Sequence, residues 1–120
     1  MGHSYDGAER RKYPRINKSL SLFFYLKDSP SKKLDETFTK DISKGGLRFT
    51  TAYSLKPGAL LVFEIGIPFI APKRLILEGL VVACREISRG YVYEIRAKFI
   101  SMSDQALQLF GMIEKQNLKG

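Results

Sequence analysis

Apolar and polar residues alternate with a period of two over most of this chain, and this alternation limits its fold more than any other feature. In the first such stretch, one face of an extended chain collects four apolar side chains: Leu20, Leu22, Phe24 and Leu26. Similar stretches follow, and turn-forming residues such as Pro57 and Gly58 separate them. We therefore expect six strands, at about residues 19–26, 34–42, 47–50, 59–67, 75–87 and 91–100.

The period changes near the C-terminus. Ser103 is a good N-cap and Asp104 suits the positive end of a helix dipole. Four apolar residues then recur at helical spacing: Ala106, Leu107, Phe110 and Ile113. These residues predict a helix at about 103–117, so we expect an all-β protein with a six-stranded antiparallel barrel, closed or nearly closed, and a C-terminal helix over one flank or one open end.

Residues 1–18 differ from the rest, because they are polar, rich in arginine and lysine, and without strand or helix period. Pro14 also biases Tyr13 away from helical geometry. We expect a flexible, basic N-terminal arm over residues 1–18 and one barrel domain over residues 19–120.

The charge balance favours anionic partners, since the formal net charge is +8 and the sequence pI is about 9.7. Cys84 is the only cysteine, which excludes an intramolecular disulfide and fits a reducing compartment, where a small buried thiol is expected. No stretch approaches the roughly 20 apolar residues of a membrane span. We expect a cytoplasmic protein without membrane insertion.

Catalytic and metal-binding groups are scarce. His3, the only histidine, lies in the polar N-terminal stretch, so neither a histidine base nor a zinc site is expected. Asp35 and Glu36 are adjacent in a predicted strand, so they point to opposite faces and are best explained as solvated edge charges. The chain has no P-loop and no dinucleotide-binding fingerprint. We expect no enzyme, no metal and no cofactor.

Two polar clusters remain. The first includes Arg10, Arg11 and Arg15, whose guanidinium groups can bind phosphate oxygens and hydrogen-bond the O6 and N7 atoms of guanine. On its own, such a run is typical of a solvated basic tail.

The second cluster contains Asp41, Ser43, Gly45 and Gly46, at the join between two predicted strands. Asp41 and Ser43 are two apart, so on an extended chain both side chains face the same way. The carboxylate can accept hydrogen bonds from N1–H and N2–H₂ of guanine, and the hydroxyl adds an adaptable partner. The glycines allow a flat ligand or a second backbone segment to come close. On its own, this cluster would be a turn closed by glycines.

Together the clusters resemble the PilZ family of cyclic di-GMP receptors, in which an Arg-x-x-x-Arg motif precedes an Asp/Asn-x-Ser-x-x-Gly motif. Arg11 and Arg15 match the first motif, and Asp41, Ser43 and Gly46 match the second. The resemblance covers nearly the whole chain, because PilZ domains are six-stranded antiparallel barrels that a helix often follows.

The resemblance implies a bacterial cyclic di-GMP receptor without catalytic activity, whose arm folds over the barrel when the ligand binds. An arginine at the position of Arg10 implies two stacked ligand molecules. The chain departs from the family in having no tryptophan near Ala83, and in having Arg96 and Lys98 where a glycine is frequent. We expect these two cations to face water, the alternative being that they add positive potential near the site.

The signal would pass to an unidentified effector protein or act through self-association as a homodimer. Two other functions stay open at this point. The chain could be a single-stranded nucleic-acid-binding barrel, which needs Tyr25, Tyr91 and Tyr93 exposed on one face. It could also be a protein-interaction module that binds no nucleotide.

Overall fold

The computed structural model describes residues 19–29, 35–67 and 74–119, without the side chains of residues 113 and 116–119. The N-terminal arm, with Arg10, Arg11 and Arg15, lies outside the described residues. The elements follow the order of the chain: β1 (Ser21–Leu26), β2 (Asp35–Ile42), β3 (Gly46–Thr51), β4 (Leu60–Gly66), β5 (Arg74–Ser88), β6 (Val92–Phe99) and α2 (Asp104–Lys119).

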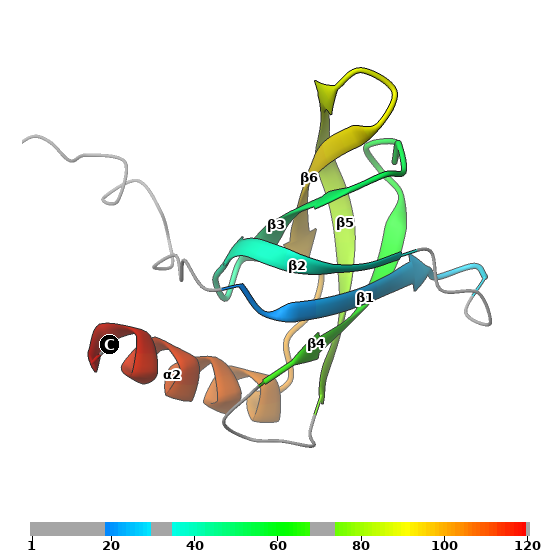
Figure 1. The fold of residues 1–120 in the computed structure, drawn as a ribbon. Coiled ribbons are helices and arrows are strands. Elements are labelled where there is room, and N and C mark those ends of the chain that lie inside the picture. The colour runs from blue at the N-terminus through cyan, green and yellow to red at the C-terminus, as the bar shows by residue number, and fades with distance from the viewer. Residues whose placement is uncertain (1–18, 30–34, 68–73, 120) are drawn as a thin grey trace, which may run out of the picture.

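The six strands form a closed barrel in the order β1-β2-β3-β6-β5-β4, and every neighbouring pair is antiparallel (Figure 1). The predicted all-β fold class is therefore confirmed. Closure pairs all the strands, which removes the exposed edges that an open sheet would have. The hairpin of β5 and β6 extends beyond the other strands at one end, and α2 lies at the opposite end (Figure 1).

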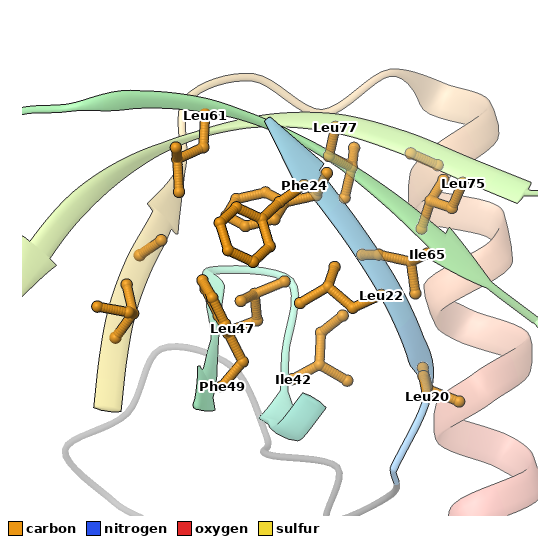
Figure 2. Close-up of a cluster of buried hydrophobic side chains, with 14 of the residues drawn as sticks. Leu20, Leu22, Phe24, Ile42, Leu47, Phe49, Leu61, Ile65, Leu75 and Leu77 are labelled. Atoms are coloured by element: carbon orange, nitrogen blue, oxygen red, sulfur yellow. The ribbon is translucent and has the colours of Figure 1, made fainter. Parts of the chain in front are cut away.

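Alternate residues of each strand fill the barrel interior, as the period of two predicts. Leu20, Leu22 and Phe24 are at most 2% exposed, and Figure 2 shows them packed with side chains from the facing strands. Four aromatic contacts connect the interior to the helix, with ring centroids 4.9–6.3 Å apart. They join five phenylalanines in the order Phe24, Phe49, Phe63, Phe99 and Phe110.

Helix α2 begins as predicted, because the hydroxyl of Ser103 accepts a hydrogen bond from the backbone N–H of Ala106 at 3.1 Å. Ala106 and Phe110 are buried against the barrel. The predicted apolar face was wrong at Leu107, which is 39% exposed, because Leu109 packs against the core instead. The side chain of Ile113 lies outside the described residues.

The predicted sixth strand also began one residue too early. Tyr91 belongs to the turn between β5 and β6 and is 76% exposed, so it does not share the inner face with Ile95. The turn needs a left-handed residue at Gly90, whose φ is 72°, and this geometry ends the extended chain there.

Candidate functional site

Asp41 lies on the outer face of the barrel because β2 contains a β-bulge. Thr39 pairs with Phe49, but Asp41 pairs with Arg48, so Lys40 is the extra residue. In a regular ladder Asp41 would lie opposite Leu47, whose side chain is in the core. The bulge thus turns this carboxylate away from the barrel interior, where it would be buried among apolar side chains.

Arg48 holds the Asp41 side chain in place. Its Nη2 donates a hydrogen bond to Oδ2 of Asp41 over 2.6 Å, and Asp41 is only 6% exposed. A charge-assisted bond between partly buried groups is among the stronger polar interactions in proteins. The bond from Arg48 therefore holds the carboxylate in one orientation.

Glu94 on β6 is the second buried carboxylate of this face, and three cations surround it. Nζ of Lys40 and Nη2 of Arg85 each lie 3.1 Å from its oxygens, and Nη1 of Arg48 lies 3.7 Å away. Burial raises the pKa of Glu94, but the bonds from Lys40 and Arg85 and the nearby charges outweigh it, so the pKa falls below its ordinary value.

These charged partners were missed in the sequence analysis. Lys40, Arg48, Arg85 and Glu94 come from β2, β3, β5 and β6. No spacing along the chain brings the four together, because cross-strand register alone makes them neighbours.

The loop after β2 forms a tight turn that places Ser43. The backbone N–H of Ser43 donates to the carbonyl of Gly46 over 2.9 Å, and the N–H of Gly45 donates to the Ser43 hydroxyl over 3.1 Å. Phe99 N–H also bonds the carbonyl of Gly45 over 2.9 Å, which attaches the loop to β6. The turn, and not an extended strand, thus decides where the hydroxyl of Ser43 lies.

Gly46 lies opposite Lys98 of β6. A Cβ at Gly46 would collide with the carbonyl oxygen of Ala97 and would lie 2.9 Å from Cα of Lys98. The glycine is therefore needed where two backbones approach closely, which is one of the two uses expected of it. The positive-φ glycines of the described residues are Gly58 and Gly90, so Gly46 is not required by a left-handed turn.

The structure thus brings Asp41, Ser43, Gly45 and Gly46 together at the junction of β2 and β3. The remaining predicted site residues, Arg10, Arg11 and Arg15, lie outside the described residues. An unexpected contact also joins this junction to α2, because Nζ of Lys44 lies 3.5 Å from Oε1 of Glu114.

The structure also shows how exposed the other residues named from the sequence are. Arg96 and Lys98 are exposed. Glu36 is exposed, but Asp35 accepts a hydrogen bond from the Thr51 hydroxyl over 2.6 Å, so it is more than a solvated charge. Cys84 is half-buried against the core. Tyr25 and Tyr93 are half-buried, unlike Tyr91 at the hairpin turn.

Within residues 19–29, 35–67 and 74–119, no three side chains of the metal-binding types are grouped as a metal site would require. No helix in this part of the chain combines the length and hydrophobicity needed to cross a bilayer.

Solved structures with the same fold share little sequence with this chain. Bacillus subtilis MotI/DgrA, an inhibitor of motility, matches with a TM-score of 0.74 and 18% identity over 92% of this chain, which spans only 52% of MotI. The PilZ domain of Escherichia coli YcgR, solved with c-di-GMP, matches with a TM-score of 0.63 and 16% identity over 89% of this chain and 93% of that domain. The K. pneumonia MrkH–c-di-GMP complex matches with a TM-score of 0.56 and 20% identity over 91% of this chain and 51% of MrkH.

Comparison with curated proteins gave no significant match. The PilZ domain family model, however, matches residues 9–113, which include the arginines of the first motif and the whole barrel. Because this match extends over most of the sequence and the barrel has the expected strands, the chain belongs to the PilZ domain family.

Proposed function

We propose that this chain is a non-catalytic cyclic di-GMP receptor, and that it binds the dinucleotide between its N-terminal arm and the junction of β2 and β3. Membership of the PilZ family supports this proposal. So do the solved structures of the E. coli YcgR PilZ domain and of K. pneumonia MrkH, which both contain c-di-GMP.

The observation that carries the proposal is the position of Asp41 beside the Ser43 turn on the outer face of the barrel. Each carboxylate oxygen has two lone pairs, so Asp41 can bond Arg48 and still accept from the N1–H and N2–H₂ groups of a guanine. The bond to Arg48 keeps the carboxylate in one orientation, which reduces the entropy lost on binding.

The arm would supply the remaining contacts. Arg11 and Arg15 would donate charge-assisted hydrogen bonds to the phosphates and to guanine, and Arg10 would help to hold a second, stacked molecule. Binding would order residues 1–18 over the barrel, and a separate effector protein or a second copy of the chain would recognise the changed surface.

Calorimetric titration with cyclic di-GMP tests the proposal on the full chain. We expect saturable binding by the wild type, with two molecules per chain if the ligand stacks. Ser43→Ala should weaken binding, and Arg11→Ala with Arg15→Ala should abolish it. Arg89→Ala removes an exposed arginine at the β5–β6 turn and serves as the matched control.

Each variant also needs a melting curve without ligand, which should stay close to that of the wild type. Wild-type protein that releases no heat with cyclic di-GMP, but binds single-stranded DNA or RNA with strong salt dependence, would disprove the receptor.

A further inference from the structure

Beside the loop of residues 43–46, the outer face of the barrel has a set of cations from neighbouring strands. Arg48 of β3 lies directly opposite Arg96 of β6, and Gly46 lies opposite Lys98. Arg96 in turn lies opposite Ala83 of β5. Asp41, Arg48, Arg96 and Ala83 therefore form one row across four strands.

Two bulges create this row. The first, at Lys40, places Asp41 opposite Arg48. The second is the register shift between Val81 and Ala83, which leaves Val82 as the extra residue and places Ala83 opposite Arg96. Val81 pairs with Ala97 on the inner face, whereas Ala83 pairs with the exposed Arg96 on the outer face.

The positive charges in this row are only partly neutralised. Arg48 bonds Asp41 and lies near Glu94. Arg96 and Lys98 are exposed, and neither has an ion-pair partner among the described residues. Like charges directly opposite each other on a sheet are destabilising, so the pair Arg48–Arg96 costs stability in the free protein. An anion bound against this row would remove that cost.

We infer that Arg96 and Lys98 of β6 also bind the ligand. They belong to neither the Arg-x-x-x-Arg motif nor the Asp-x-Ser-x-x-Gly motif, and they extend the site onto β6. This inference rests on the proposed function. A ligand seated on the 43–46 loop lies next to Lys98, because Cα of Lys98 would be 2.9 Å from a Cβ at Gly46. The Lys98 ammonium then neutralises a phosphate as a flexible point charge.

Arg96 has a different role. It lies in the same row as Asp41 and two strands away, at a distance of about 10 Å given the usual strand spacing. Asp41 accepts from the N1 and N2 side of a guanine, and Arg96 donates to O6 and N7 of the same base. The residue opposite Arg96 on β5 is Ala83, whose side chain is small, and Arg96 is exposed.

The extent of the cationic row fits a small ligand better than a nucleic-acid strand. On the β5 side, Lys98 faces Leu80 and Arg96 faces Ala83, and Arg85, the next cation along β5 on this face, is paired with Glu94. An extended strand needs a basic groove that continues along its backbone, with aromatic residues for the bases.

The test is calorimetric titration of full-length Arg96→Gln and Lys98→Gln with cyclic di-GMP, with Arg89→Gln as a control that removes the same charge at the β5–β6 turn. We expect each of the two variants to bind at least tenfold more weakly, and Arg89→Gln to bind like the wild type. Without ligand, Arg96→Gln should melt at the same temperature as the wild type or slightly higher, because the like-charge pair is gone.

Arg96→Lys separates charge from shape, since lysine keeps the charge but not the planar donor pair. Its affinity should fall between those of the wild type and Arg96→Gln. Wild-type affinity in both Gln variants would overturn the inference and leave the receptor function intact. Equal weakening in Arg89→Gln would also overturn it, because net charge would then explain the effect. A wild type that binds no cyclic di-GMP would disprove the proposed function and this inference with it.

Discussion

Nζ of Lys44, in the middle of the Asp-x-Ser-x-x-Gly motif, lies 3.5 Å from Oε1 of Glu114 on α2. Their side chains are 27% and 19% exposed, so the pair is partly shielded from solvent. Oε2 of Glu114 is buried and has no hydrogen-bond partner among the described residues. The contact links the candidate ligand loop to the C-terminal helix, and it neutralises one cation of that loop.

Glu114→Gln should therefore raise the affinity for cyclic di-GMP a few-fold, because Lys44 becomes available to a phosphate. The free energy of unfolding should change by less than about 1 kcal/mol, as is usual for such pairs. Titration and a melting curve measure the two effects. Lys115→Gln, on the exposed neighbouring residue, is the control. A lower affinity in Glu114→Gln would mean that the ion pair supports binding.

The ion pairs of Glu94 should make stability depend on pH. The pKa of this carboxylate is lowered in the folded protein, while an unfolded glutamate has its ordinary value of 4.5. The stabilisation is therefore complete above about pH 5 and is lost as the pH falls through the folded pKa.

Glu94→Gln should destabilise the protein by about 1–2 kcal/mol at pH 7, a modest loss because Lys40 and Arg85 are well exposed. The difference between the two proteins should shrink toward pH 3. Urea denaturation at several pH values measures it, and a difference independent of pH would contradict this account.

Gly46→Ala should destabilise the barrel by about 1–3 kcal/mol, because the new methyl group meets backbone atoms of β6 and neither strand can move freely. Gly111→Ala is the matched control, since a Cβ there meets nothing within 4 Å and lies in a helix. It should stabilise by about 0.5–1 kcal/mol. Thermal melting compares the two, and an unchanged Gly46→Ala would show that the strands can separate at this point.

Phe110→Ala should cost about 3–4 kcal/mol, since this ring is fully buried and is the contact of α2 with Phe99. Met112→Ala, at a side chain that is 46% exposed, should change stability by less than about 0.5 kcal/mol. Chemical denaturation separates the two. A loss of stability in Phe110→Ala as small as that in Met112→Ala would mean that α2 adds little to the stability of the barrel.

The alternation of residues such as Leu22 and Phe24 was enough to predict the six strands and most of the residues on their inner faces, because the direction of a side chain in a strand is a local property. The cap at Ser103 likewise predicted where α2 begins. Leu107 was assigned to the buried face wrongly, because the tilt of a helix on a barrel is set by the surface beneath it.

The sequence by itself determined the barrel class and identified Asp41, Ser43 and Gly46 as motif residues, since family motifs and strand periods are visible along the chain. Only the tertiary structure decided which side chains meet across strands. Each bulge, at Lys40 and at Val82, shifts the register by one residue, and a shift of one residue changes the cross-strand neighbours of every following position. The contacts of Asp41 with Arg48 and of Arg48 with Glu94 follow from that register, and no local pattern encodes it.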